Sequence, residues 1–217
     1  MLVRKWMSKN PITIDINDTL TEAIDVLKRN RIRRLPVLKD GKLVGIVSDR
    51  DLKEASPSKV TSLDIWEVHY LLSKIKIKDI YRRNPITIRD DSTVEKAAVI
   101  MYDEKVGGLP VVDGKGDLVG MLTEHDVFNA LIRITGARVP SYRVSMCLPD
   151  EGGAIKEVCD ILDNYKHKCI SILNTYYEVR ENRRSVIIRF QTDKENVPKI
   201  IAQLEEKFEN VQMIEEL

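Results

Sequence analysis

The sequence predicts an α/β protein, made of two copies of one strand–helix–strand–strand–helix unit followed by a third unit of a different pattern. Three observations support this prediction. They are a repeat with an offset of 74 residues, the alternation of short apolar strands with amphipathic helices, and a Gly/Pro-bearing boundary before the last third of the chain. At 217 residues the chain is also longer than one average domain.

The repeat keeps the order of its segments and changes length at one point, a turn, where the second copy has one extra residue. An insertion confined to a turn is expected for two copies of one structural unit. Because a unit of about 50 residues buries little core alone, the copies are expected to pack together around a pseudo-two-fold axis. The recurring segments are Asn-Pro-Ile-Thr-Ile at 10–14 and 84–88, Leu-Pro-Val at 35–37 and 109–111, and Leu-Val-Gly at 43–45 and 118–120.

Each copy is expected to contain a short strand, an amphipathic helix, a hairpin and a final helix. In copy one, the first helix carries apolar residues at i, i+3, i+4 and i+7, starting from Leu20. In copy two, Ser92 and Glu95 form a capping box at the start of the corresponding helix. In copy one, strands are expected at 12–14, 35–38 and 43–47, and helices are expected to begin near 18 and near Ser48. The last helix of copy two is expected to begin near Thr123.

The connection between the copies, 56–78, is long and contains a predicted helix from Ser62, with Leu63, Trp66 and Tyr70 on one side. Two interpretations stay open. The helix closes the groove between the copies, or Trp66 and Tyr70 face a ligand or a second subunit.

After the boundary at 135–140, the pattern of apolar residues in the last third of the chain predicts a βαββαβ unit. Strands are expected at 142–148, 169–179, 185–191 and 211–214, and helices at 154–162 and 194–208. This order is that of a split βαβ, ferredoxin-like unit.

The composition excludes several function classes. The net charge of +1 provides no whole-molecule field that would recruit nucleic acid or membrane. No apolar run approaches the ~18–20 residues that a membrane span requires, and the N-terminus lacks a signal-peptide core, so a cytoplasmic location is expected. The three cysteines match no metal or redox motif, and no metal site is expected.

Three motifs occur in order and twice: Asn-Pro-Ile-Thr-Ile, a Leu-Pro-Val strand after a helix, and Gly-x-x-Ser/Thr-x-x-Asp. Together they resemble a tandem pair of CBS domains, a Bateman module, over about residues 1–135. The resemblance implies one CBS repeat at 1–60, a linker helix at 61–78 and a second repeat at 79–135.

The Ser/Thr-x-x-Asp motif also has a chemistry of its own. A helix N-terminus favours a phosphate, a hydroxyl there adds a hydrogen bond, and an Asp one turn along can accept both hydroxyls of a ribose. The alternative is that the motif only caps its helix. The resemblance implies adenosine-containing ligands such as AMP, ADP, ATP or S-adenosylmethionine. It implies one site at Thr13, Arg34, Leu35, Pro36, Ser48 and Asp51, and another at Thr87, Gly108, Leu109, Pro110, Thr123 and Asp126. Arg50 and His125 are expected at the phosphate ends of these two sites.

The two expected sites differ in charge. Copy one carries Arg50 and the arginines at 29, 31, 33 and 34, where copy two has His125 and two glycines. Because an Arg can hold a phosphate in a bidentate fork, a more highly phosphorylated ligand is expected to prefer the first site. A solvated face is the alternative interpretation of the arginine cluster.

The last third, 141–217, resembles an ACT domain. The resemblance rests on Asp150-Glu151-Gly152-Gly153-Ala154-Ile155, close to the family's Asp-x-x-Gly-x-hydrophobic loop, although Gly152 stands where the family usually has Pro. It implies an amino-acid site at Asp150, Gly152, Gly153, Ala154 and Ile155, or a dimerising role through exposed sheet edges. The glycine pair can also serve only to turn the chain.

A CBS pair followed by an ACT domain resembles the AcuB-type acetoin-utilisation proteins and related regulators. The expected function is therefore regulatory: a homodimer senses an adenine nucleotide, which is a regulatory ligand and not a catalytic cofactor, and alters the activity of a metabolic enzyme. A scaffold with unliganded clefts is the alternative.

An enzyme is not expected, because no nucleophile–base pair is found and His69, His125 and His167 fall in three different elements. A nucleic-acid binder is not expected either, because the arginine cluster lacks a helix-turn-helix or an aromatic RNA motif.

Overall fold

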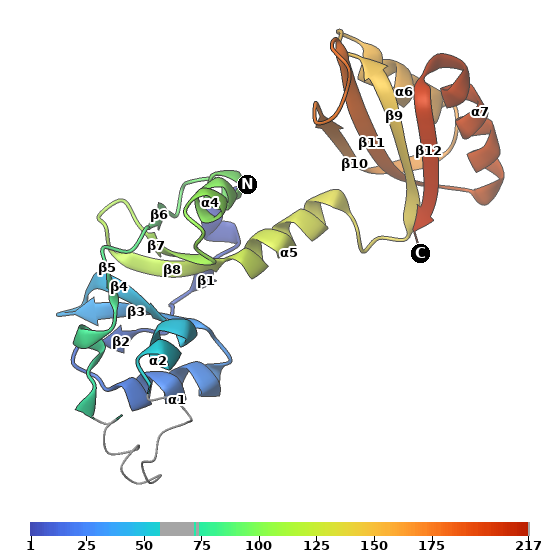
Figure 1. Cartoon of the computed structure of the whole chain (residues 1–217). Helices are drawn as coiled ribbons and strands as arrows, with labels where there is room; N and C mark the ends of the chain where they lie inside the picture. The colour runs from blue at the N-terminus through green and yellow to red at the C-terminus, as the bar shows by residue number, and fades with distance from the viewer. Residues whose placement is uncertain (57–71, 73, 217) are drawn as a thin grey trace. The chain divides into compact units, whose positions relative to one another are not determined.

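The computed structural model describes residues 1–56, 72 and 74–216, and its chain divides into two compact units, Met1–Phe128 and Asn129–Leu217 (Figure 1). Each unit is described by itself. Most of the helix predicted from Ser62, including Leu63, Trp66 and Tyr70, lies outside the described residues.

In the first unit, the earlier repeat forms a four-stranded sheet of order β2-β3-β4-β5. The apolar stripe predicted from Leu20 is confirmed: Leu20 and Ala23 are fully buried and pack on Leu35 and Val37 of the sheet. The strands are β2 (Ile14–Asp15), β3 (Arg34–Lys39), β4 (Lys42–Ser48) and β5 (Arg82–Arg83), and the helices are α1 (Leu20–Asn30) and α2 (Asp49–Glu54).

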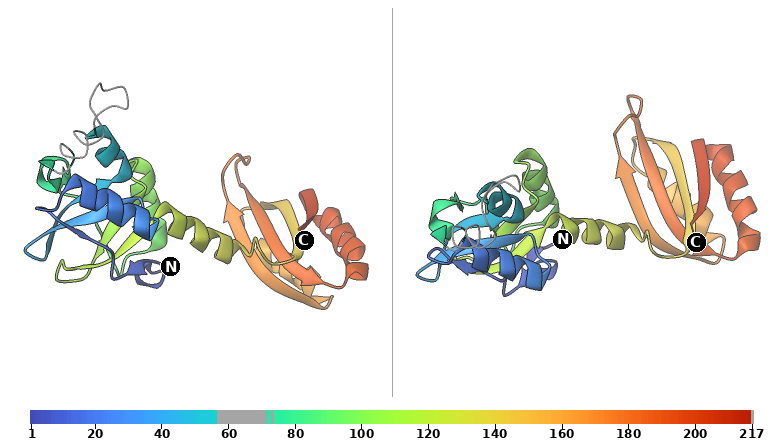
Figure 2. Two further views of the ribbon diagram at one scale, coloured as in Figure 1. Left: turned by 90° about the horizontal axis from the view of Figure 1, so that it is seen from below. Right: turned by 60° about the horizontal axis from the view of Figure 1, so that its bottom comes forward.

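The later repeat forms a second four-stranded sheet of order β1-β8-β7-β6. Its core repeats that of the first, with Ala97 and Met101 packed against Leu109 and Val111. The strands are β1 (Ser8–Lys9), β6 (Ile88–Arg89), β7 (Gly108–Val112) and β8 (Leu118–Thr123), and the helices are α4 (Val94–Asp103) and α5 (Glu124–Thr135). Figure 2 shows the blue first repeat against the green second repeat in both views.

The two repeats exchange their leading segments. The 3-10 helix η1 (Val3–Lys5) and β1 precede the first repeat in sequence but join the second sheet, with β1 antiparallel to β8. The equivalent η2 (Ile77–Asp79) and β5 join the first sheet, next to β4. Val3 and Ile77 are both 0% exposed, so each repeat is completed by a buried residue from the other's leading segment.

Glycine permits the close approach of the exchanged strands. A Cβ atom on Gly45 in β4 would collide with the Tyr81 ring and with the Arg82 carbonyl oxygen. The equivalent Gly120 in β8 faces Met7 and Ser8 in the same way. Any larger residue would force β1 or β5 away from its neighbour, which explains the glycine of the repeated Gly-x-x-Ser/Thr motif.

The second unit is a four-stranded antiparallel sheet of order β10-β11-β9-β12, with α6 and α7 on one face (Figure 1). This strand order confirms the predicted βαββαβ ferredoxin-like unit. Its core includes Val144, Met146, Phe190 and Leu204. The elements are β9 (Ser141–Pro149), α6 (Ala154–Asp163), β10 (His167–Thr175), β11 (Arg183–Thr192), the 3-10 helix η3 (Lys194–Asn196), α7 (Val197–Lys207) and β12 (Glu209–Glu216).

Two local predictions were wrong. The helix α4 is capped by Thr93, whose hydroxyl accepts from the Lys96 backbone N–H at 3.1 Å, and not by Ser92. Strand β10 ends at Thr175, short of the predicted 179, because the chain turns there before Glu178 takes a positive φ. No helix among the described residues is both long and apolar enough to span a membrane.

Thr19 and Glu22 form a capping box at the start of α1. The Thr19 hydroxyl accepts from the Glu22 N–H at 3.2 Å, and Glu22 accepts from the Thr19 N–H at 2.7 Å and from its hydroxyl at 2.8 Å. Hydrogen bonds from the Thr19 backbone and then from its side chain lower the pKa of Glu22.

Thr19→Ala is expected to lower the free energy of unfolding by about 1 kcal/mol at neutral pH, because it removes this cap. The difference in unfolding free energy between the variant and the wild type should become smaller below about pH 4. The lowered pKa of Glu22 stabilises the fold only while Glu22 is ionised, and this contribution is lost when Glu22 is protonated. Urea unfolding, monitored by tryptophan fluorescence at neutral pH and below pH 4, measures the loss of stability and its pH dependence. Thr21→Ala is the control, because the buried Thr21 hydroxyl has no partner among the described residues. A similar loss in both variants would contradict the cap.

Candidate functional site

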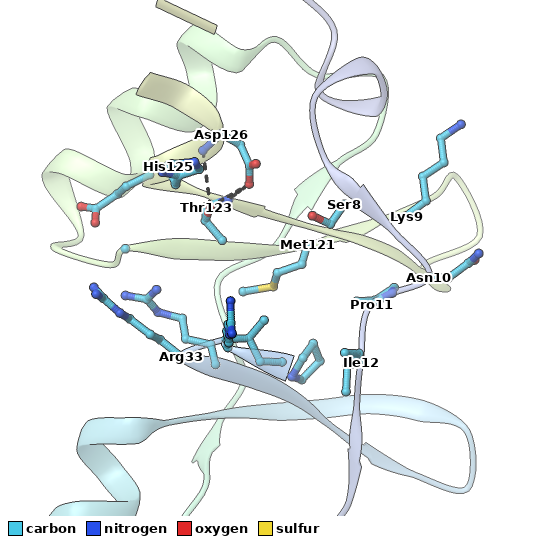
Figure 3. A pocket seen from close by; sticks show the side chains of 16 residues that line it. Ser8, Lys9, Asn10, Pro11, Ile12, Arg33, Met121, Thr123, His125 and Asp126 are labelled. Carbon is cyan, nitrogen blue, oxygen red and sulfur yellow. Dashed lines mark hydrogen bonds between the residues drawn. The ribbon is translucent and has the colours of Figure 1, made fainter. Parts of the chain in front are cut away.

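The first unit contains two clefts between its repeats. The larger, here called the Asp126 cleft, has a volume of about 650 Å³, which suits a small ligand. Figure 3 shows it, with Thr123, His125 and Asp126 on one wall and Ile12 and Arg33 on the facing wall. It is lined by Ser8, Lys9, Asn10, Pro11, Ile12, Arg31, Ile32, Arg33, Arg34, Pro36, Gly107, Met121, Thr123, Glu124, His125 and Asp126.

The smaller, here called the Asp51 cleft, has a volume of about 480 Å³ and is lined by the equivalent positions of the opposite repeats. Its lining residues are Arg33, Arg34, Ile46, Ser48, Asp49, Arg50, Asp51, Arg82, Pro85, Ile86, Lys105, Val106, Gly107, Gly108 and Pro110.

Each cleft is therefore composite, with lining residues from both repeats, whereas the sequence-based grouping draws each site from one repeat. Thr123 and Asp126 share a cleft with Pro36 of the first repeat, and Ser48 and Asp51 share one with Pro110 of the second. The physical reason is the packing of the two sheets, which places the Leu-Pro strand of one repeat opposite the last helix of the other.

In the Asp126 cleft, the helix start orients the carboxylate. Oδ2 of Asp126 accepts from the Thr123 backbone N–H at 2.8 Å and from its hydroxyl at 2.7 Å. In the part of the chain that the structure describes, Oδ1 accepts no hydrogen bond. The capping interaction and a ligand-binding role are thus compatible, because they use different oxygens of one carboxylate.

In the Asp51 cleft, the carboxylate has an additional partner. Oδ2 accepts from the Ser48 N–H at 2.8 Å and from the Ser48 hydroxyl at 2.5 Å. Oδ1 accepts a hydrogen bond from Nε of Arg82 at 2.8 Å, and Nη2 of Arg82 forms an ion pair with the same oxygen, also at 2.8 Å. Burial raises the pKa of Asp51, but the hydrogen bonds from Ser48 and Arg82 outweigh it and the net shift is downward, so Asp51 is a carboxylate at neutral pH.

Apolar side chains line both clefts at equivalent positions. In the Asp126 cleft these are Pro11, Ile12, Pro36 and Met121, and in the Asp51 cleft they are Pro85, Ile86, Pro110 and Ile46. Ile12 and Ile86 are 40% and 38% exposed, which is high for isoleucine. A flat apolar ligand group would cover them.

Arg33, Arg34 and Gly107 line both clefts and connect them. The Arg34 side chain passes so close to Gly107 that a Cβ atom there would collide with the guanidinium and come within 2.7 Å of Glu124. The glycines of the second repeat thus make room for the arginines of the first. Arg33 and Arg34 therefore do more than form a solvated face, which was the alternative interpretation of the arginine cluster.

Arg50 and His125 lie at the rims of their clefts. The Arg50 guanidinium is committed to Glu54, with Nε 2.8 Å from the carboxylate, and its side chain is 80% exposed. His125 is exposed on the wall shown in Figure 3.

Four predicted site residues do not line either cleft. Leu35 and Leu109 are 0% exposed and belong to the two cores, because alternate residues of a strand point to opposite faces. Thr13 and Thr87 are also absent from both linings, and Thr87 lies with Val44 and Tyr81 at a separate surface depression.

Sequence reasoning missed Arg82, Met121, Ile86 and Gly107 as lining residues. Ile86 lies inside the repeated Asn-Pro-Ile-Thr-Ile segment, directly before the predicted Thr87. Arg82 has no sequence signal, because its contact with Asp51 spans 31 residues.

In the second unit, the loop predicted for an ACT ligand is a turn before α6. Gly153 has φ +98°, which a residue with a side chain rarely adopts, and this supports the turning role of the glycine pair. Asp150 accepts from the Tyr176 hydroxyl at 3.1 Å, and Arg184 donates to the Glu151 carbonyl at 3.1 Å. Gly152 has open space around it, and Ala154 and Ile155 begin α6. Amino-acid binding at this loop stays a prediction.

Known proteins resemble the first unit. The profile of the CBS domain matches residues 3–58 and 77–133, more than half of the chain. A CBS domain-containing protein of Dictyostelium discoideum is 42% identical over 135 residues, which are 62% of this chain and 93% of that protein. That relative has little room for a separate catalytic domain.

Solved structures of CBS pairs agree. CBSX2 of Arabidopsis thaliana in complex with AMP is 32% identical, with a TM-score of 0.50 over 61% of this chain and 97% of that one. The CBS domain pair of protein MJ0100, in complex with 5′-methylthioadenosine and S-adenosyl-L-methionine, is 32% identical, with a TM-score of 0.50 over 60% and 99%.

An acetoin-utilisation protein (AcuB) of Vibrio cholerae, named as putative, is 27% identical, with a TM-score of 0.52 over 64% of this chain and 95% of that one. The second unit adds an α/β sheet domain to the paired repeats, and its assignment to the ACT family stays a prediction. The paired repeats, their order and the profile match lead to one conclusion: this chain belongs to the CBS-domain family.

Proposed function

We propose that this chain is a regulatory protein that binds an adenosine-containing ligand, such as AMP, ADP, ATP or S-adenosylmethionine, in the Asp126 cleft. The observation that carries the proposal is the Asp126 carboxylate. Thr123 holds one of its oxygens, and the other accepts no hydrogen bond from the described residues. A fixed carboxylate on a cleft wall suits the two hydroxyls of a ribose.

The remainder of the cleft suits the other parts of such a ligand. Pro11, Ile12 and Met121 offer an apolar surface for a base. Arg33 and Arg34 place positive charge beside the start of α5, where the positive end of the helix dipole also favours a phosphate. The CBS pairs crystallised with AMP and with S-adenosyl-L-methionine support the same ligand class.

Regulation would follow from a ligand that contacts both repeats. Because the Asp126 cleft is built from both sheets, bound ligand would favour the arrangement that closes it, and a metabolic enzyme bound elsewhere on the chain would sense the change. The second unit would contribute dimerisation or an amino-acid site.

Asp126→Asn is expected to weaken AMP binding by at least about tenfold, since a hydrogen bond to a charged group contributes about 1.5–3 kcal/mol. The asparagine oxygen can still accept from Thr123, so the helix cap is largely retained. Isothermal titration calorimetry measures the affinity, and urea unfolding verifies the fold. Asp103→Asn, at an exposed position outside both clefts, is the control.

If AMP, ADP, ATP and S-adenosylmethionine give no heat at millimolar concentration, the sensing function is wrong. The alternative, a scaffold with unliganded clefts, would then be favoured. Mass spectrometry of the purified protein under native conditions provides a second comparison, because a sensor is expected to retain nucleotide that a scaffold lacks.

We also propose a homodimer, on the basis of apolar side chains that α4 and α5 leave exposed. Val99 is 58% exposed, Tyr102 84% and Phe128 62%. Analytical ultracentrifugation is expected to show a two-chain species, and Tyr102→Glu is expected to shift it toward the monomer because a charge would be buried at the interface. A wild-type monomer at high micromolar concentration would contradict this proposal.

A further inference from the structure

The two clefts hold equivalent carboxylates with different surroundings. Both Asp51 and Asp126 use Oδ2 to accept from the backbone and hydroxyl of the residue three places earlier. They differ at Oδ1. In Asp51 it accepts a hydrogen bond from Nε of Arg82 and is ion-paired with Nη2, whereas in Asp126 it accepts no hydrogen bond from the described chain.

The difference traces to one pair of equivalent positions in the exchanged strands. In β5, Arg82 is paired with Ile46 of β4, and in β1, Ser8 is paired with Met121 of β8. Each of these residues lines its own cleft, so Arg82 and Ser8 occupy the same place in the two halves. The short serine leaves the carboxylate of Asp126 accessible, and the long arginine reaches that of Asp51.

We infer that Arg82 closes the Asp51 cleft to nucleosides by occupying the oxygen that a ribose would use, so that the chain binds one nucleoside, in the Asp126 cleft. This inference rests on the proposed function and names the residue that decides which cleft is used. A ribose would have to replace a charge-assisted N–H hydrogen bond and an ion pair with bonds from neutral hydroxyls, which are weaker.

Two further features make the Asp51 cleft less suited to a nucleoside than the Asp126 cleft. The Asp51 side chain is 9% exposed and its carboxylate is shared between Ser48 and Arg82, so little of it remains accessible to a ligand. Arg50, which the sequence suggested as a phosphate ligand, is instead paired with Glu54. Arg82 itself is 65% exposed, so its removal is not expected to unfold the protein.

The test is the stoichiometry of AMP binding by isothermal titration calorimetry on the full chain. The wild type is expected to bind one AMP per chain and Arg82→Ser two. Arg83→Ser is the matched control, because Arg83 is the next residue of β5 and its guanidinium lies over Tyr81, 5.9 Å from the ring centroid. It is expected to bind one.

Three more variants test which of the two clefts holds the bound AMP. Asp126→Asn is expected to lose binding by at least about tenfold in the wild-type background, but Arg82→Ser combined with Asp126→Asn is expected to keep one site, in the opened Asp51 cleft. Ser8→Arg, which transfers the arginine to the other half, is expected to weaken AMP binding in the Asp126 cleft by a similar factor.

Two sites in the wild type, or one site in Arg82→Ser, would overturn the inference while the proposed function stands. Loss of a site in Arg82→Ser would identify Arg82 as a phosphate ligand and would also overturn it. If the wild type binds no AMP, the proposed function fails. Gain of one site in Arg82→Ser would then still support the closing role of Arg82, and no binding in either protein would overturn it.

Discussion

Val3 completes the core of the second repeat, and Ile77 completes the core of the first. The architecture of the first unit depends on this exchange. Both side chains are fully buried, and each is followed by a two-residue strand that pairs across to the other half. Because neither sheet is complete without the other's leading segment, the repeats fold as one unit. The clefts between them follow from the same exchange, since both repeats must contribute to each wall.

The exchange also explains how two repeats with the same order of elements provide different chemistry. Equivalent positions keep the glycine that permits close strand approach, the hydroxyl that starts the helix and the carboxylate one turn along. What differs is the side chain that the exchanged strand directs toward that carboxylate, Arg82 in one half and Ser8 in the other. A single substitution in a two-residue strand can therefore alter a cleft without changing the fold around it.

The fold could be predicted from the sequence where periodicity was strong. The stripe starting at Leu20 and the alternation in 142–148 correspond to buried faces of α1 and β9, and the paired hydroxyl and carboxylate residues lie at helix starts on cleft walls. Strands of two residues, such as β1 and β5, are too short to show an alternation of apolar and polar residues. Their exchange between the repeats could therefore not be predicted from the local sequence pattern.

The same limit applies to the candidate site. Leu35 and Leu109 were assigned to the clefts because they belong to the repeated motif, but side-chain alternation along a strand places them in the cores beside the lining prolines. The pairing of Arg82 with Asp51 depends on tertiary packing across 31 residues, and no spacing rule reports it.

The position of Arg33 and Arg34, which line both clefts through the space left by Gly107, has an electrostatic consequence. The two clefts share the positive charge of these two guanidinium groups, although Lys9 and Arg31 line the Asp126 cleft alone and Arg82 and Lys105 line the Asp51 cleft alone. An anion held on one side neutralises charge that the other side would use, and the two sides are therefore in competition for a common counter-charge. The two clefts are in this way coupled electrostatically, although the partners of their carboxylates differ.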